Sequence, residues 1–197
     1  STDDAFSQIG FFSDGSGDIT GGINVRAKSG GVVLNSGTNG AYTQIGHGGR
    51  GSTGGVAIDA PINITFCEPA ELTLQGGAGL NAYAQIGNGG QGFSGTGIGG
   101  DITITDAGNV AVWAGANGGA YAQLGHGGLL AVGDSVSGLS DGNPDFEGDI
   151  SLNTLNGGNL SVRGTQSTSG GLDDGRKAYA QVGHGGAQAD GGATGTI

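Results

Sequence analysis

The sequence predicts an all-β protein, a parallel β-helix (β-solenoid) with essentially no helix and about one coil per repeat of roughly 40 residues. Three observations support this prediction. A nine-residue word recurs along the chain, short segments alternate between apolar and polar residues, and glycine supplies 49 of the 197 residues. Collagen would require glycine at every third position together with abundant proline, but the chain has only three prolines. The glycines therefore indicate turns between short strands.

The repeated word is clearest as Ala-Tyr-Ala-Gln-Ile-Gly-Asn-Gly-Gly, residues 82–90. Close copies begin at Ala41, Ala120 and Ala178, and a shorter copy begins at Ala5. A repeat of this kind takes precedence over other interpretations, because each unit of a repeat protein buries its apolar face against its neighbours.

Each repeat contains two or three short apolar segments, then the word, then a glycine-rich arm. Alternation with period two predicts strands, and no segment keeps the 3.6-residue period of an amphipathic helix. In chain order the predicted strands, apart from the copies of the word, are residues 18–20, 23–25, 32–34, 56–58, 62–64, 72–74, 101–104, 109–112, 149–152 and 159–162.

We interpret residues 1–197 as a single solenoid domain. It consists of a partial repeat at 1–16, repeats at about 17–55, 56–100, 101–148 and 149–192, and the start of a further repeat at 193–197. Both ends fall inside a repeat, and atypical capping repeats are not recognisable. Because bare end strands recruit partners, we expect end-to-end self-association or continuation of a longer solenoid.

The repeat length also allows two coils of about 20 residues each. The glycine-rich arms at 46–55 and 87–100 contain few apolar residues, so we expect no second set of core strands there. The arms are either excursions from the solenoid or extended glycine strands that pack on each other. A third arm, 125–148, contains Leu129-Leu130-Ala131-Val132 and could fold locally. One coil per repeat is therefore the preferred interpretation.

Alternation gives the strand of the word two different faces. Ala82, Ala84 and Ile86 form a small, apolar face that suits a narrow core. Tyr83 and Gln85 lie on the other face, which either points outward or lines a contact between sheets. With neighbouring strands ~4.8 Å apart, equivalent residues would stack into ladders. The predicted structural ladder contains Tyr42, Tyr83, Tyr121 and Tyr179 beside Gln44, Gln85, Gln123 and Gln181.

The succession of Gly-Asp-Ile-Thr, Asn-Val-Ala-Val and Ala-Tyr-Ala-Gln-Ile-Gly-His/Asn-Gly-Gly resembles the repeats of large bacterial exoproteins of the filamentous-haemagglutinin type. The resemblance covers roughly residues 17–197. It implies a secreted, right-handed parallel β-helix, extracellular or at the cell surface, that acts in adhesion or as an extended stalk. Partners would be cell-surface glycans or receptors of host or neighbouring cells. Such motifs maintain coils, so the resemblance assigns no functional residue.

Charge and apolar content exclude some classes of partner. The formal net charge is −11, with only six basic residues, so the chain lacks the basic footprint of nucleic-acid binding. No apolar run approaches the ~20 residues of a membrane-spanning helix. Cys67 is the single cysteine, which excludes an intrachain disulfide, and we expect it to be buried or half-buried.

Oxygen-bearing side chains alternate along one acidic segment and form a candidate Ca²⁺ site. The candidate ligands are Asp141, Asn143, Asp145, Glu147 and Asp149. Hard oxygen ligands suit Ca²⁺, but Phe146 stands where an EF-hand loop requires glycine. A solvated acidic loop is the alternative.

The histidines share one position of the word. His47, His126 and His184 occupy it in three copies, and Asn88 occupies it in the fourth. Stacked histidines could share a metal, but exchange with asparagine favours a turn corner.

These observations together favour a structural, non-enzymatic segment of a secreted filament or surface adhesin, with no cofactor. The alternative is a carbohydrate-binding or carbohydrate-active β-helix domain. Glycosidases need paired carboxylates in a cleft, and a sugar platform usually needs several exposed aromatics, whereas Trp113 is the only tryptophan. Ice binding would require a regular Thr-x-Thr array, and only Thr103-Ile104-Thr105 matches.

Overall fold

A computed structural model describes residues 5–12, 17–52, 57–131, 146–155, 157–165, 178–189 and 193–197. Over these ranges the chain forms 17 strands and no helix. All strand pairs are parallel, and the strands form four sheets. The all-β, helix-free prediction is confirmed for this part of the chain, and the architecture is a solenoid-like parallel β fold.

We number the sheets in the order in which the first full repeat enters them. Sheet I contains β2 (Ile23–Ala27), β6 (Ile62–Phe66), β10 (Ile102–Ala107) and β14 (Ile150–Thr154). Sheet II contains β3 (Val32–Asn35), β7 (Leu72–Gln75), β11 (Val110–Trp113) and β15 (Leu160–Arg163). Sheet III contains β1 (Phe6–Ile9), β4 (Tyr42–Ile45), β8 (Tyr83–Ile86), β12 (Ala122–Leu124) and β16 (Ala180–Val182). Sheet IV contains β5 (Ala57–Asp59), β9 (Gly97–Gly99), β13 (Phe146–Glu147) and β17 (Ala193–Thr194).

Each sheet takes its strands from successive repeats, with equivalent residues opposite each other. In sheet I, Ile62 pairs with Ile23 on one side and with Ile102 on the other. In sheet III, Gln85 pairs with Gln44 and Gln123. Because side chains alternate between faces, this register keeps the apolar residues of every repeat on the same side.

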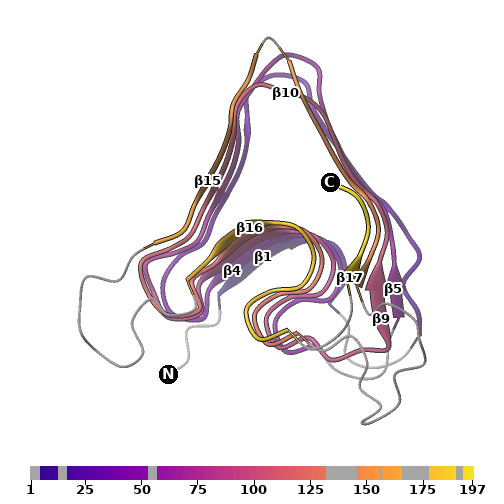
Figure 1. Cartoon of the computed structure of the whole chain (residues 1–197), viewed down its shortest axis with the longest axis vertical. Helices are drawn as coiled ribbons and strands as arrows, with labels where there is room; N and C mark the ends of the chain where they lie inside the picture. Colours follow the sequence, from indigo (N-terminus) through magenta and orange to yellow (C-terminus); the bar gives the residue numbers. More distant parts are fainter. Residues whose placement is uncertain are drawn as a thin grey trace.

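Figure 1 shows the repeats superimposed when the molecule is viewed along its shortest axis. Sheets I and II form the two long sides of a triangle, and sheet III closes its base. After sheet III the glycine-rich arms curve back underneath it and lead to sheet IV. The arms therefore pack on the lower face of sheet III.

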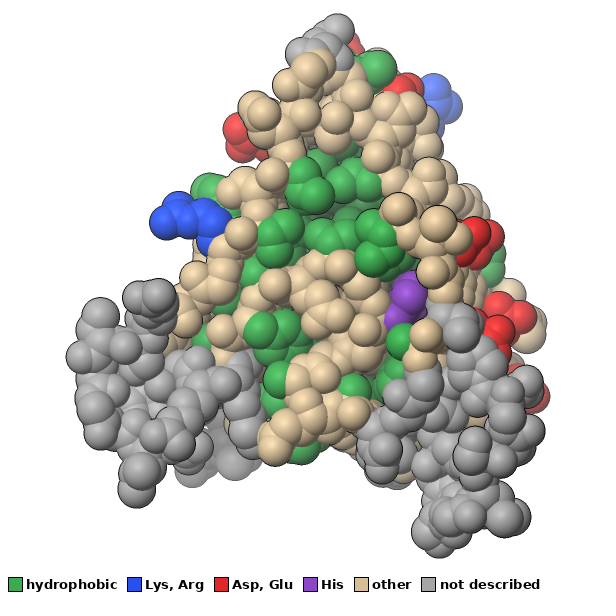
Figure 2. Space-filling model, in the orientation of Figure 1, with side chains coloured by type: hydrophobic (Ala, Val, Ile, Leu, Met, Phe, Trp, Pro, Cys, Tyr) green, Lys and Arg blue, Asp and Glu red, His purple; other side chains and the backbone are tan. Residues whose placement is uncertain are grey.

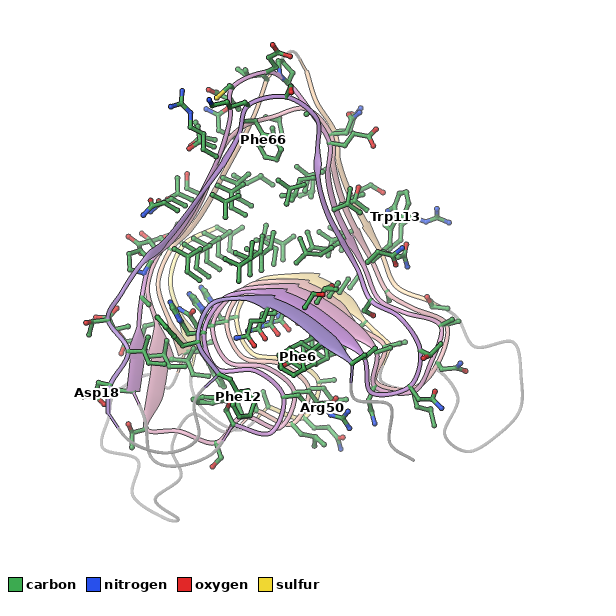
Figure 3. All side chains as sticks on the ribbon, turned by 180° about the vertical axis from the view of Figure 1, so that it is seen from behind. Phe6, Phe12, Asp18, Arg50, Phe66 and Trp113 are labelled. Atoms are coloured by element: carbon green, nitrogen blue, oxygen red, sulfur yellow. The ribbon has the colours of Figure 1, made fainter. Side chains whose placement is uncertain are left out.

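The main core fills the triangle between sheets I, II and III (Figure 3). Its members are apolar residues that alternate along the strands, including Ile62, Leu74, Ile86 and Val112, each 0 % exposed. On the word strand, Ala84 and Ile86 point into this core, as their small and apolar character predicts.

The structure corrects the prediction that the arms build no further core strands. β9 lies inside the arm 87–100 and belongs to the fourth parallel sheet. Its Ile98 packs with Phe93 of the same arm, and with Ile58 and Phe146, in a second apolar cluster. A few large side chains suffice here, because the neighbouring glycines let the backbones approach closely.

Candidate functional site: the inter-repeat ladder

Among the described residues, polar side chains of the repeated word form a buried array on the lower face of sheet III. The side chains of Tyr83, Gln85, Tyr121 and Gln123 are each 0 % exposed there. Sheet III covers them from above and the arms cover them from below (Figure 3). The tyrosine and glutamine face therefore lines an internal contact and does not point outward.

The tyrosines form one continuous stack. Neighbouring ring centroids lie 4.9 Å apart for Tyr42–Tyr83, 4.6 Å for Tyr83–Tyr121 and 4.9 Å for Tyr121–Tyr179. Phe6 continues the stack at 5.0 Å from Tyr42, and all of these ring pairs are nearly parallel. The spacing matches the distance between neighbouring strands, so the parallel register produces the stack directly.

The glutamines run beside the tyrosines and join three segments. The side-chain amide of Gln85 donates to the backbone oxygen of Asn88 in its own repeat. It also donates to the oxygens of Gly125 and Gly127 in the next repeat. Its Oε1 accepts a 3.1 Å hydrogen bond from the hydroxyl of Tyr121. One side chain therefore holds the arm of its own repeat and the word of the next.

Equivalent bonds recur along the column. Gln8, Gln44 and Gln123 also donate to glycine oxygens of the following repeat. The tyrosine hydroxyl bonds to the preceding glutamine at Tyr42–Gln8 (3.3 Å) and Tyr179–Gln123 (3.0 Å). No such bond joins the hydroxyl of Tyr83 to Oε1 of Gln44, although both atoms are buried.

The histidine and asparagine position forms a third column. The backbone N–H of His126 donates to Nδ1 of His184 at 3.2 Å, and the N–H of Asn88 donates to Nδ1 of His126 at 2.9 Å. Where the next repeat carries asparagine, its Oδ1 takes the same role and accepts the N–H of His47 at 3.0 Å. Each side chain thus satisfies a backbone donor of the preceding repeat.

The second polar atom of these side chains binds the segment that leads from sheet IV to sheet I. Nε2 of His47 lies 2.8 Å from the oxygen of Gly21, and Nε2 of His184 lies 2.9 Å from that of Gly148. Because Nδ1 is an acceptor, Nε2 carries the proton and donates. Asn88 makes the equivalent contacts through Nδ2, which donates to the backbone oxygens of Ala60 and Gly99 at 2.8 Å.

Burial sets the ionisation of these groups. It lowers the pKa of His126 to about 3, assisted by the neighbouring His184 and opposed by the hydrogen bond to Gly100. Burial also lowers the pKa of His47 and of His184. The histidines are therefore neutral near pH 7, as the hydrogen bonds of Nδ1 require. Burial raises the pKa of Tyr121, so its hydroxyl remains a donor.

Glycine is required where the word turns into the arm. Gly87 has a φ of +152°, and a Cβ placed on it would lie 1.9 Å from the oxygen of Gly125. Gly46 and Gly125 meet the next repeat in the same way. These contacts let each arm lie directly against the next arm.

The candidate Ca²⁺ site lies mostly outside the described residues, because Asp141, Asn143 and Asp145 fall there. Glu147 and Asp149 are exposed. Oδ1 of Asp149 accepts the backbone N–H of Thr196 at 2.7 Å, so this carboxylate links two repeats. Within the described ranges no three His, Cys, Asp or Glu side chains come together as a metal site.

Two other candidates have ordinary surroundings. Cys67 is exposed, which corrects the prediction that it is buried or half-buried. It lies next to Phe66, which fills the core, so its own side chain points to the opposite face. Trp113 is partly buried on sheet II, where Nε1 donates to Ser161 at 3.2 Å and the Arg163 guanidinium lies 5.7 Å from the ring.

The histidine column shows what the sequence interpretation missed. Residues 46–48 do form a bend, but His47 is 1 % exposed and uses both ring nitrogens within the protein. The presence of Asn88 at the histidine position was the sequence signal for this hydrogen-bonding role. Nδ1 of histidine and Oδ1 of asparagine occupy the same place in the side chain, and both accept hydrogen bonds.

Comparison with protein-family models, curated proteins and solved structures finds no significant match in any of the three. No helix of the described residues has the length and apolarity needed to span a membrane.

Proposed function

We propose that this chain is a structural, non-enzymatic segment of a secreted extracellular filament or surface adhesin. In this proposal one repeat makes one coil of a β-solenoid, and the coils at each end join further coils. The observation that best supports this proposal is the ladder, because the buried polar side chains of the word bind neighbouring repeats rather than enclosing a space for a ligand.

The one-coil interpretation is supported by the order of the strands. A repeat visits sheets I, II, III and IV once each before the next repeat enters sheet I. Hydrogen bonds between strands then run only between neighbouring repeats. A structure of this kind lengthens by adding repeats, and its rigidity comes from contacts between nearest neighbours.

Exposed ends support joining to further coils. Phe6 and Ile9 at the N-terminal end are 57 % and 52 % exposed, and Leu160 and Val162 at the C-terminal end are 48 % and 43 % exposed. Figure 2 shows hydrophobic side chains gathered in the centre of one such face. The extracellular location, and adhesion to cell-surface glycans or receptors, rest on the resemblance of the repeats to filamentous-haemagglutinin-type exoproteins.

Electron microscopy of the protein isolated from its source tests this proposal. We expect filaments or stalks of constant width whose axis is built from strands ~4.8 Å apart, measurable by fibre diffraction. Discrete particles that release sugars from glycans would contradict it and support a carbohydrate-active domain.

The alternative of carbohydrate binding is favoured by one feature. A groove of about 430 Å³ runs along the junction of sheets II and III, and polar side chains of Asn35, Gln75 and Thr165 line it. Trp113 directly precedes the groove residue Ala114. If sugars bind here, Trp113→Ala will abolish retention on a glycan column under conditions in which circular dichroism shows that the variant is folded. Equal retention of both proteins would exclude this site.

A further inference from the structure

The contacts between repeats have a direction. The glutamine of each repeat reaches forward to the next repeat, as Gln85 does to Gly125. The tyrosine hydroxyl and the histidine ring reach backward, as Tyr121 does to Gln85 and His126 to the N–H of Asn88. A complete junction therefore needs glutamine from the earlier repeat, and tyrosine with histidine or asparagine from the later one.

The first copy of the word lacks only the groups that reach backward. Phe6 occupies the tyrosine position and Phe11 the histidine position. The forward groups are intact: Gln8 donates to the oxygen of Gly46 at 2.9 Å. The backbone N–H of Phe11 donates to Nδ1 of His47 at 3.1 Å. The first repeat can therefore bind a repeat after it, but at the tyrosine and histidine positions it offers no polar side chain to a repeat before it.

The opposite end of the stack shows the converse. The amide of Gln181 donates to the oxygen of His184 within its own repeat at 3.0 Å. No later tyrosine or histidine is present in the described residues to meet Oε1 of Gln181 or the N–H of His184. Phe6 and Phe11 of a second copy could supply neither group.

The register of the last described residues shows which sheet a further strand would join. Among the described residues, sheet III has five strands, sheet IV has four strands plus the bridge of Ile19 to β5, and sheets I and II have four each. The N–H of Ile150 donates to the oxygen of Thr196, as that of Ile102 donates to Asp149. The next strand therefore belongs in sheet I, but the first strand of a second copy, β1, belongs in sheet III.

We propose that the C-terminal end of the stack is a docking surface for a further coil with particular side chains at the ladder positions. This coil enters at sheet I and carries tyrosine, with histidine or asparagine, at the two ladder positions. Phe6 and Phe11 exclude the first repeat of a second copy from the same surface. The inference rests on the proposed function as a stack of coils and specifies which coil each end accepts.

A tandem of two full chains tests the inference. In this tandem, a second set of residues 102–119 replaces Ile197 of the first copy and leads into Ala5 of the second copy. The inserted residues supply the missing strands of sheets I and II. The restored tandem carries Phe6→Tyr and Phe11→His in the second copy. The matched control is the swapped tandem, Phe6→His and Phe11→Tyr, which has the same composition with the groups in the wrong places.

Amide hydrogen exchange of β16 in the first copy reports on the junction, and exchange of β8 shows that each copy is folded. We expect β16 to exchange at least about tenfold more slowly in the restored tandem than in the unchanged and swapped tandems. Equal protection in the unchanged and restored tandems would overturn the role of Phe6 and Phe11. An unprotected β16 in every tandem with a protected β8 would overturn the docking surface. Neither result would alter what microscopy shows about filaments.

The same two substitutions in the single chain provide the folding control. Because tyrosine and histidine keep aromatic rings that can stack on Tyr42 and His47, we expect Phe6→Tyr with Phe11→His to leave the denaturation midpoint unchanged. A large fall in that midpoint would show that the two phenylalanines are needed for stacking on Tyr42 and His47 of the following repeat, and this would overturn the assignment of a role confined to the junction between copies.

Discussion

The hydroxyl of Tyr121 donates a hydrogen bond to Oε1 of Gln85, a residue of the preceding repeat, and both side chains are completely buried. The ring of Tyr121 also stacks on that of Tyr83, with the two centroids 4.6 Å apart. A hydrogen bond and a ring contact thus connect β8 with Tyr121, the residue that directly precedes β12. Because the bond is shielded from water, losing one partner leaves the other without a replacement.

Tyr121→Phe will therefore reduce stability while the ring stack remains. It leaves Oε1 of Gln85 buried without its hydroxyl donor, which costs about 1–3 kcal/mol in free energy of unfolding. Urea unfolding followed by circular dichroism measures the change. Tyr83→Phe is the matched control, because no hydrogen bond joins Tyr83 to Gln44, and we expect a smaller loss. An equal loss in both variants would show that the hydroxyl bond is not the cause.

Gln85→Leu will be more damaging than Tyr121→Phe. It removes the donor for three backbone oxygens, those of Asn88, Gly125 and Gly127, and exposes them to an apolar side chain. The oxygen of Asn88 keeps the backbone N–H of Gly127 as a donor, whereas the oxygens of Gly125 and Gly127 lose the amide of Gln85. Each buried acceptor left unpaired costs about 1–3 kcal/mol, so the variant will unfold at lower urea concentration.

Gln181→Leu is the control for the glutamine column. Gln181 lies in the last copy of the word and is only partly buried, and among the described residues its amide donates to the oxygen of His184. We expect a loss of about 1 kcal/mol or less in free energy of unfolding. A loss as large as that of Gln85→Leu would contradict the inter-repeat role of Gln85.

The strands could be predicted because alternation and repetition agree. Ile62, Ile64, Leu72 and Leu74 alternate with polar residues, and all four are buried in the core. In sheet IV the strand predicted at 56–58 matches β5, but β9 was missed because it reads Gly97-Ile98-Gly99 and has one large apolar side chain. Its stability comes from Phe93 and Phe146, whose sequence positions give no sign that they would meet Ile98.

The ladder was only partly predictable. Equivalent spacing of Tyr83 and Tyr121 in the word predicts a column once a parallel stack is assumed. The partners of Gln85 could not be predicted, because its carbonyl acceptors lie in a glycine arm whose path depends on positive φ angles. The backward direction of the histidine ring depends on side-chain rotamers, which repetition in the sequence does not encode.

Gly87→Ala will disrupt the contact between successive arms. The added Cβ would lie 1.9 Å from the oxygen of Gly125, and the φ of +152° is itself unfavourable for alanine. We expect a loss of several kcal/mol, on the order of 3 or more, or a failure to fold. Gly97→Ala in β9 is the control, since nothing lies within 4 Å of its Cβ position. A fall in thermal midpoint that is equal for the two variants would contradict the arm contact.

The identity of the side chain at position 126 can be tested by exchange. His126→Asn reproduces the chemistry of Asn88, whose Oδ1 accepts a backbone N–H and whose Nδ2 donates to Ala60 and Gly99. We expect it to cost less than about 1.5 kcal/mol. His126→Leu leaves the N–H of Asn88 and the oxygen of Gly100 unpaired and will cost about 2–4 kcal/mol. Equal urea midpoints for the two variants would show that the position serves only to fill space.

Acid will destabilise the fold through the same histidines. Burial lowers the pKa of His126 to about 3 in the folded chain, whereas the unfolded chain has a value near 6.5. The neutral ring is favoured in the fold, so its contribution is complete above about pH 6.5 and is lost as the pH falls toward about 3. Protonation would place an N–H of the ring against the N–H of Asn88.

Unfolding free energies measured between about pH 7 and pH 5 separate this effect from most carboxylates, which titrate lower. We expect the stability of the unchanged protein to fall over this interval. The fall will be shallower for His126→Asn, which lacks one titrating ring, but will persist because burial also lowers the pKa of His47 and His184. Identical slopes for the two proteins would mean that His126 is protonated equally in the folded and unfolded chains, contrary to its buried, hydrogen-bonded position.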